Sequence, residues 1–189
     1  MSAMTARDFE RRYRACADPW GYRSSPYERS KYAATLDACG PGPFEAALEL
    51  GGSIGVFSAQ LAPRCRSLTT VDFSPTAARE ALAALGQHPH VRVLVGEIPQ
   101  ALPEGKFDLV VASEILYYLD AGAFTETLEQ IRRGLIIGGR LVCVHWRKSG
   151  PDRPLTAGHV HEQVQAQSWL RPVRSESGDE YLLDALDRR

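Results

Sequence analysis

The sequence predicts a doubly wound α/β fold, in which helices cover both faces of a mostly parallel β-sheet. Between residues 46 and 146, five short and nearly continuous apolar runs alternate with segments of helical periodicity. Strands of a parallel sheet are buried on both faces, so they read as continuous apolar runs. Right-handed crossovers then place the intervening helices on both faces of the sheet. Residues 159–189 break the alternation, which predicts that the sheet closes with an antiparallel hairpin.

Turn residues and apolar spacing delimit the elements in order. The chain begins with helices expected over residues 5–17 and 27–39, the first ended by Asp18-Pro19-Trp20-Gly21. The apolar runs predict strands over residues 46–50, 67–71, 90–95, 107–113 and 140–146. Helical periodicity between them predicts helices over residues 55–63, 75–85 and 121–135. A further helix is expected over residues 159–168, followed by strands over 169–177 and 181–187. The turn Ser177-Gly178-Asp179-Glu180 joins these last strands, and we expect an antiparallel strand at one edge of the seven-stranded sheet.

Composition limits the class of partner. The 22 basic and 23 acidic residues give a formal net charge of −1, which argues against nucleic acid as a partner of the whole surface. No run of about 20 apolar residues predicts a membrane span. The first residues lack the apolar centre of a secretory signal, so we expect a cytoplasmic protein. Four cysteines without C-x-x-C spacing predict neither a zinc site nor a disulfide framework.

The candidate site lies after the apolar runs, because open parallel sheets bind ligands beyond the carboxyl ends of their strands. The first run leads into Glu49-Leu50-Gly51-Gly52-Ser53-Ile54-Gly55. Glycines let the backbone approach a ligand closely, and the helix that follows presents unpaired amides. A dinucleotide fingerprint needs glycines at n, n+2 and n+5, and a P-loop needs Gly-Lys-Ser/Thr. Neither pattern is present in this segment.

The pattern that fits, E-x-G-x-x-x-G, resembles the first motif of class I S-adenosylmethionine-dependent methyltransferases. Ser53 stands where that family often has a third glycine. Asp72 follows Gly51 by 21 positions, where a carboxylate can accept both ribose hydroxyl protons. Glu97 ends the third run, where the family usually has an aspartate that contacts the adenine amino group. The resemblance implies a Rossmann-like class I methyltransferase sandwich that binds S-adenosylmethionine, releases S-adenosylhomocysteine and needs no metal.

The resemblance also implies a layout for the chain. Residues 1–189 are expected to form one methyltransferase domain, with a helical lid over 1–40, a cofactor-binding core over 45–146, and an acceptor-side loop and hairpin over 147–189. Tyr13, Trp20, Tyr22 and Arg29 of the lid are expected to close over the cofactor and one end of the acceptor, with a solvated basic helix face as the alternative interpretation. The full set of expected cofactor-binding residues is Glu49, Gly51, Gly52, Ser53, Gly55, Asp72, Phe73, Glu97, Ile98, Ser113, Trp20 and Arg29.

Four dispersed blocks resemble the nodulation protein S family over about residues 8–165. They are Asp18-Pro19-Trp20-Gly21-Tyr22, Ser25-x-Tyr27-Glu28-Arg29-x-Lys31-Tyr32, Ser113-Glu114-Ile115-Leu116-Tyr117-Tyr118-Leu119 and His145-Trp146-Arg147. That family is known for N-methylating the free amine of a deacetylated chitin oligosaccharide. The resemblance implies a small-molecule acceptor, either an amino sugar or oligosaccharide or a similar small amine. O-methylation of a small natural-product hydroxyl and an inactive cofactor-binding scaffold are the alternatives.

The main candidate catalytic groups lie where the fourth and fifth runs end. An amine needs a free lone pair to accept a methyl group, so a base or desolvation of the amine would assist the reaction. His145 is the first candidate for the proton acceptor and His161 the second, with a structural hydrogen bond as the alternative role of each. Glu114 is expected to bind the methionine ammonium or steer the acceptor amine, and Tyr117 to orient the acceptor.

Overall fold

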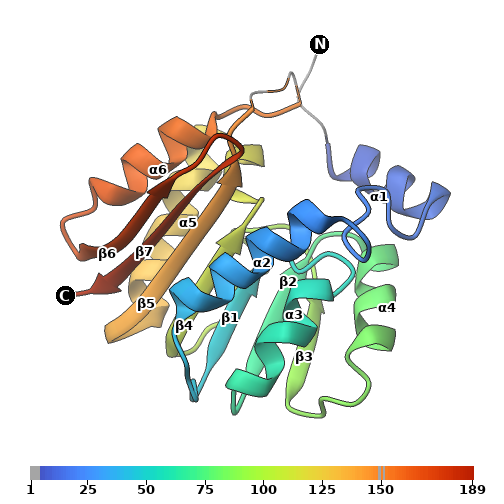
Figure 1. Cartoon of the computed structure of the whole chain (residues 1–189), viewed down its shortest axis with the longest axis horizontal. Helices are drawn as coiled ribbons and strands as arrows, with labels where there is room; N and C mark the ends of the chain where they lie inside the picture. Colours follow the sequence, from blue (N-terminus) through green and yellow to red (C-terminus); the bar gives the residue numbers. More distant parts are fainter. Residues whose placement is uncertain (1–4, 149, 151) are drawn as a thin grey trace.

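The computed structural model describes residues 5–148, 150 and 152–189. Seven strands form one sheet: β1 (Ala47–Leu50), β2 (Leu68–Asp72), β3 (Val91–Val95), β4 (Phe107–Ser113), β5 (Leu135–Trp146), β6 (Leu170–Ser177) and β7 (Tyr181–Arg188). Their order across the sheet is β3-β2-β1-β4-β5-β7-β6 (Figure 1). Strands β1 to β5 pair in parallel, and β7 runs antiparallel to both β5 and β6. The α/β architecture with a C-terminal hairpin is therefore confirmed.

The position of the antiparallel strand differs from the expectation. Strand β7 lies inside the sheet, between β5 and β6, and the edge strand β6 points the same way as β1 to β5. The reason is that β7 pairs with β5 along seven residues, from Arg140 opposite Asp187 to Trp146 opposite Tyr181. This pairing joins segments far apart in the sequence, so the turn residues of the hairpin did not reveal which of its strands contacts β5.

Side-chain caps set the starts of most helices. Thr5, Ser25, Ser74, Asp120 and Thr156 each accept a backbone N–H at the start of a helix. The corresponding helices are α1 (Ala6–Ala15), α2 (Pro26–Cys39), α4 (Pro75–Ala84), α5 (Ala121–Gly134) and α6 (Ala157–Gln165). Helix α3 (Val56–Leu61) runs into the 3-10 turn η1 (Ala62–Arg64), and a second 3-10 turn, η2 (Leu116–Tyr118), follows β4. No helix in the described part of the chain has the length and apolar character needed to cross a bilayer.

Strand β5 begins earlier than expected. Leu135 follows α5 directly and already pairs with Phe107, so Gly138 and Gly139 lie within the strand rather than in a turn before it. Four residues of β5 lie between Leu135 and Arg140, whereas one residue of β4 lies between their partners Phe107 and Leu109. The extra residues form a bulge, which the two glycines accommodate.

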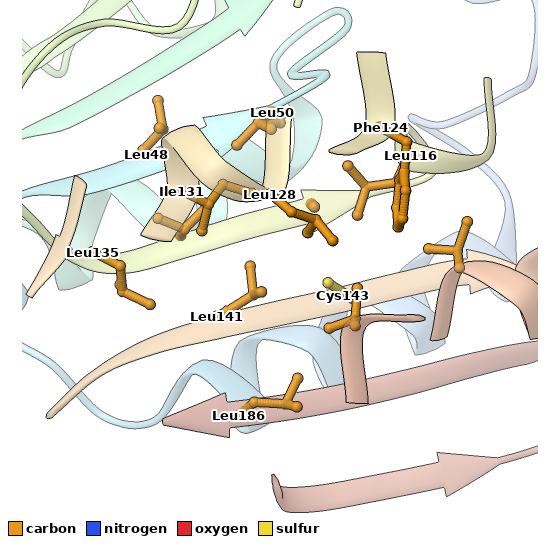
Figure 2. Close-up of a cluster of buried hydrophobic side chains, with 14 of the residues drawn as sticks. Leu48, Leu50, Leu116, Phe124, Leu128, Ile131, Leu135, Leu141, Cys143 and Leu186 are labelled. Atoms are coloured by element: carbon orange, nitrogen blue, oxygen red, sulfur yellow. The ribbon is translucent and has the colours of Figure 1, made fainter. Parts of the chain in front are cut away.

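Two apolar layers hold the helices against the sheet. One layer joins α5 and α6 to one face, and its members include Leu48, Leu50 and Leu128 (Figure 2). The other layer joins α2 and α3 to the opposite face and includes Ala47 and Leu61. Neighbouring residues of β1 thus belong to opposite layers, as the alternation of a strand requires. With both faces covered, the carboxyl ends of the parallel strands are the place left for a ligand.

Candidate active site

A cavity of about 660 Å³ lies at the carboxyl ends of β1 to β5, and residues of α1 and of the start of α2 also line it. Aromatic and acidic side chains dominate its wall. Twelve of the residues expected in the site line this cavity: Trp20, Glu49, Gly51, Gly52, Ser53, Asp72, Phe73, Glu97, Ile98, Ser113, Glu114 and Tyr117. The structure therefore gathers residues that are up to 97 positions apart in the sequence, since 117 − 20 = 97.

The glycine loop after β1 is fixed against β2. Gly51 has a φ of +75° and Ser53 a φ of +50°, which is the left-handed region. A Cβ on Gly52 would lie 1.8 Å from Oγ1 of Thr70, so this position requires glycine because β2 is close to it. The N–H of Ser53 donates to Oδ2 of Asp72 over 2.8 Å. Ser53 thus adopts the left-handed backbone that glycine favours, and its amide is held by Asp72.

Asp72 ends β2 with its carboxylate oriented by backbone amides. Oδ2 accepts the N–H of Ser53, and Oδ1 accepts the N–H of Ser74 over 2.9 Å. Burial raises the pKa of Asp72 to about 6, although these two amides favour the ionised form. Each carboxylate oxygen has a second lone pair, and Asp72 lines the cavity. The site can therefore accept two hydroxyl protons from a ligand such as a ribose.

Glu49 lies at the bottom of the cavity and is almost completely buried. The hydroxyl of Ser58 on α3 donates to its Oε2 over 2.5 Å. Burial raises the pKa of Glu49 to about 7, although the hydrogen bond from Ser58 opposes that shift. This carboxyl group therefore joins the end of β1 to α3 and sets the path of the glycine loop between them.

Helix α1 is attached to the start of α4 by one carboxylate. Glu10 accepts from Oγ of Ser74 over 2.5 Å and from Oγ1 of Thr76 over 2.7 Å. Burial opposes ionisation, yet these hydrogen bonds lower the pKa of Glu10 to about 2. Sequence analysis missed Glu10, because a lone glutamate on an amphipathic helix reads as a solvated residue. Its contacts hold α1 against the segment that follows β2.

Three aromatic side chains of the N-terminal segment line one side of the cavity: Tyr13, Trp20 and Tyr22. The Tyr13 hydroxyl lies 2.5 Å from Oγ of Ser53, which joins α1 to the glycine loop. Trp20 packs edge-on against Tyr13 with ring centroids 5.2 Å apart, and it stacks on Tyr22 at 5.8 Å. These rings give the cavity an apolar side above the glycine loop.

A buried ionic cluster forms another part of the wall. Nζ of Lys31, whose side chain is 2% exposed, lies 2.7 Å from Oε1 of Glu114 and 3.1 Å from the carboxylate of Glu28. Burial raises the pKa of Glu28, although Lys31 opposes the shift. The Tyr27 hydroxyl is buried without a hydrogen-bond partner among the described residues, and it lines the same cavity. Lys31 and Glu28 appeared in the sequence only within a family block, with no assigned role.

Strand β5 holds Glu114 in an unusual conformation. Glu114 has a φ of +56°, which a side chain other than glycine rarely adopts. Its N–H donates to the carbonyl of Val144 over 2.8 Å, and its Oε2 accepts the N–H of Trp146 over 3.1 Å. The Tyr117 hydroxyl donates to the same oxygen. Both carboxylate oxygens are thus engaged, and the side chain points to the cavity with a fixed orientation.

Four expected site residues lie away from the cavity surface. His145 is fully buried and His161 is nearly so, and the two rings pack together between β5, α6 and β7. This placement corrects the expectation that either imidazole faces the acceptor. Arg29 is exposed and donates to the carbonyl of Ser24, because its position on α2 points it to solvent. Gly55 has a φ of +78° and lies against Ala81 of α4, so its role is helix packing.

Only part of residues 147–189, the segment expected on the acceptor side, lines the cavity. Lys148, Gly150, Asp152 and Arg153 line the cavity, whereas residues 157–165 form α6 on the far side of β5. The guanidinium of Arg153 lies 4.6 Å from the Tyr117 ring centroid and 4.9 Å from that of Trp146. In the described ranges, no three His, Cys, Asp or Glu side chains gather as a metal site would require.

Comparison with known proteins gives a family. The protein-family model described as Nodulation protein S (NodS) matches residues 2–143 of this chain. A Nodulation protein S from Rhizobium tropici is 35% identical over 148 residues, which are 77% of this chain and 61% of that protein. Another from Sinorhizobium fredii is 31% identical over 130 residues, which are 68% of this chain and 60% of that protein. The chain thus spans about three fifths of the length of these curated relatives.

Solved structures agree with the sequence comparison. A putative methyltransferase from Pseudomonas syringae is 35% identical, with a TM-score of 0.76, over 86% of this chain and 99% of that one. The N-methyltransferase NodS from Bradyrhizobium japonicum WM9, in complex with S-adenosylhomocysteine, is 25% identical with a TM-score of 0.87, over 98% and 99% of the two chains. The fold is that of the class I methyltransferases, and the chain belongs to the Nodulation protein S family.

Proposed function

We propose that this chain transfers a methyl group from S-adenosylmethionine to the nitrogen of a small amine, with an amino sugar as the preferred class of acceptor. The observation that carries the proposal is the buried cluster of Glu28, Lys31 and Glu114, which shares one cavity with the glycine loop and Asp72. One end of the cavity suits a nucleoside, and the other suits a cation.

The residues at the nucleoside end fit S-adenosylmethionine. Asp72 presents lone pairs for two ribose hydroxyls, while Glu97 and Ile98 after β3 line the part of the cavity where an adenine would lie. Ser53 and Gly51 bring the backbone to the surface of the cavity. The related N-methyltransferase NodS was solved with S-adenosylhomocysteine, which supports the same ligand for this chain.

The charge of the ionic cluster favours an amine over a hydroxyl. Glu28 and Glu114 contribute −2 and Lys31 contributes +1, so the cluster carries −2 + 1 = −1 when all three groups are ionised. Buried charges are stable when they are paired. An incoming ammonium group would neutralise the cluster, whereas a hydroxyl would leave its charge uncompensated. The unpartnered Tyr27 hydroxyl adds a hydrogen-bonding group at the same place.

The same cluster can prepare the amine for reaction. Bound S-adenosylmethionine supplies a methyl group on a sulfonium, which an unprotonated amine takes with its lone pair as the carbon–sulfur bond breaks. The ammonium form must first give up one proton, and a carboxylate with a raised pKa is a better proton acceptor than an ordinary one. Glu28 has such a raised pKa because it is buried. We assign Glu28 as the proton acceptor and Glu114 as the group that orients the amine.

Two assays test the proposal in order. Calorimetry with S-adenosylhomocysteine is expected to show binding, and a chain that does not bind it is not a methyltransferase. Transfer of a tritiated methyl group is then measured with glucosamine oligomers and with the matched N-acetylated oligomers. We expect transfer to the free amine alone, with mass spectrometry placing the methyl group on nitrogen. Equal labelling of both oligomers, or labelling of phenols only, would point to O-methylation instead.

A variant of Glu28 tests its role in the reaction separately from binding of the cofactor. Glu28→Gln keeps the shape of the side chain and removes the base, so turnover is expected to fall by roughly 10²-fold or more. The dissociation constant of S-adenosylhomocysteine should stay within about twofold, because Glu28 contacts Lys31 of α2, whereas Asp72 is held by the amides of Ser53 and Ser74. The exposed Glu45 provides the matched control as Glu45→Gln. Full turnover in Glu28→Gln would remove Glu28 from the reaction.

A further inference from the structure

A hydrogen-bonded chain of buried groups lies behind the cavity wall, outside the site described above. The N–H of Leu116 donates to Nε2 of His145 over 3.2 Å. Nδ1 of His145 lies 3.1 Å from Nε2 of His161, and Nδ1 of His161 lies 2.6 Å from Oδ2 of Asp184. All three side chains are buried. These hydrogen bonds thus connect β7 through α6 and β5 to the turn η2.

The two ends of this chain fix every proton within it. A backbone amide can only donate, so Nε2 of His145 is unprotonated and its proton is on Nδ1. That proton is donated to Nε2 of His161, whose own proton is therefore on Nδ1 and is donated to Asp184. Burial alone would raise the pKa of Asp184, but hydrogen bonds from His161, Ser175 and Gln165 hold it below the usual value. Both imidazoles are consequently neutral Nδ1–H tautomers beside a carboxylate.

The hydrogen-bonded groups cannot carry a proton from the acceptor, because the series ends at the amide of Leu116. Their effect is to position the residues around that amide. Three successive residues of β5 hold the segment that follows β4: Val144 accepts the N–H of Glu114, His145 accepts that of Leu116, and Trp146 donates to the Glu114 carboxylate. Of these three β5 residues, only His145 uses its side chain, so only its contact depends on a tautomer.

The segment held in this way carries the acceptor end of the site. Glu114 has the left-handed backbone noted above, and the Tyr117 hydroxyl donates to its carboxylate. The Tyr117 ring packs edge-on against the His145 ring, with centroids 5.0 Å apart. A change of one imidazole would therefore reach Glu114 along two routes, through the amide of Leu116 and through the ring of Tyr117.

We propose that Asp184, His161 and His145 are positioning residues for methyl transfer, which hold the turn from Glu114 to Tyr118 so that the Glu114 carboxylate stays oriented toward the acceptor. The inference rests on the proposed function for its kinetic consequence. The tautomers themselves do not depend on any activity, so the two can fail separately.

The first test is direct observation of the tautomers. Long-range ¹⁵N–¹H correlation spectra of the ¹⁵N-labelled chain distinguish Nδ1–H from Nε2–H histidines. We expect His145 and His161 to be neutral Nδ1–H tautomers, and the exposed His159 on the same helix as His161 to show the averaged pattern of a solvated ring. An Nε2–H proton on either buried ring would overturn the proposal.

The second test compares two variants of His145. Both break the bond to His161, but in His145→Gln the amide oxygen can replace Nε2 as the acceptor for Leu116, whereas His145→Leu has no acceptor. We expect kcat to fall on the order of 10²-fold in His145→Leu, since a small misplacement of a reacting group has an effect of that size. In His145→Gln the loss should be less than about tenfold. KM for S-adenosylmethionine and binding of S-adenosylhomocysteine should stay within twofold in both.

The outcomes separate positioning from a purely structural role. His159→Leu, two residues from His161 on α6, is the control and should keep full turnover. Equal losses of kcat in His145→Gln and His145→Leu would overturn the proposal, as would a loss expressed only in KM for the cofactor. If His145→Leu fails to fold, the tautomer spectra of the unmodified protein still test the hydrogen bonds of His145, His161 and Asp184 on which the proposal rests, and an Nε2–H proton on either ring overturns it. An unmodified chain that methylates no amine would refute the proposed function and leave the tautomer result standing.

Discussion

Replacing Lys31 with methionine tests the ionic cluster most directly. The change removes the cation between Glu28 and Glu114 and keeps a side chain of similar length. It deletes ion pairs of 2.7 and 3.1 Å at a side chain that is 2% exposed. Breaking a buried pair by removing one partner costs about 3–5 kcal/mol, because the charge left behind is uncompensated. For a chain of this size, that loss lowers the melting temperature by roughly 6–20 °C.

The loss should depend on pH in a fixed direction. Burial already raises the pKa of Glu28 above its ordinary 4.5, and removing Lys31 raises it further. A carboxyl whose pKa is raised by folding stabilises the folded state below its unfolded pKa, and this contribution is lost as pH rises through the folded pKa. The deficit of Lys31→Met relative to the unmodified chain is therefore expected to be smaller at pH 5 than at pH 8.

Urea unfolding at both pH values measures this effect. Lys106→Met is the matched control, because Lys106 is exposed and its substitution should change the free energy of unfolding by less than about 0.5 kcal/mol. The double change Lys31→Met with Glu28→Gln should recover part of the loss, since it removes one of the two unpaired carboxylates. A loss in Lys31→Met as small as that of the control would mean that water solvates the cluster and would refute the charge argument.

Three further predictions concern the nucleoside end of the cavity. Asp72→Asn should weaken binding of S-adenosylhomocysteine by about 1.5–3 kcal/mol in calorimetry, because a charged acceptor of hydroxyl protons is lost; unchanged affinity would place the ribose elsewhere. Gly52→Ala should lower the free energy of unfolding by about 1–3 kcal/mol, because its Cβ would meet Oγ1 of Thr70 at 1.8 Å. Glu49 has a pKa raised to about 7, so ionising it costs stability as pH rises from about 4.5 through 7. Glu49→Gln should remove that part of the pH dependence, up to about 3 kcal/mol in urea unfolding at pH 8 against pH 5.

The parts of the fold that could be predicted from the sequence are those with local signals. Strand β4 begins and ends where the apolar run of residues 107–113 does, and the loop from Gly51 to Gly55 follows β1 as its glycines indicate. The strand order could not be derived in this way, because the position of β7 depends on pairing with β5 across about 40 residues, such as Leu141 with Leu186. The turn residues predict the hairpin itself, but which of its two strands lies at the edge depends on pairing with β5.

The residues of the candidate site could likewise be predicted only where the sequence signal is local. Asp72 and Glu97 were found because each ends an apolar run. Lys31 was not, because its partner Glu114 is 83 positions away and its nearer partner Glu28 makes an i,i+3 pair that reads as a surface pair on a helix. His161 lies within the helix expected over residues 159–168, but this helix, α6, buries the imidazole instead of presenting it to the cavity.

The contacts of Glu114 and Glu28 indicate different roles for these two carboxylates. Glu114 is held at both oxygens, by Lys31 on one side and by Tyr117 and the N–H of Trp146 on the other, so its orientation is fixed. A group held in this way loses its partners if it takes up a proton, which makes it a poor acceptor for the proton of the amine. Glu28 is less constrained, and burial makes it the stronger base. It follows that Glu114→Gln should act mainly by disturbing the position of the amine, whereas Glu28→Gln should remove the pH dependence of turnover that arises from the base.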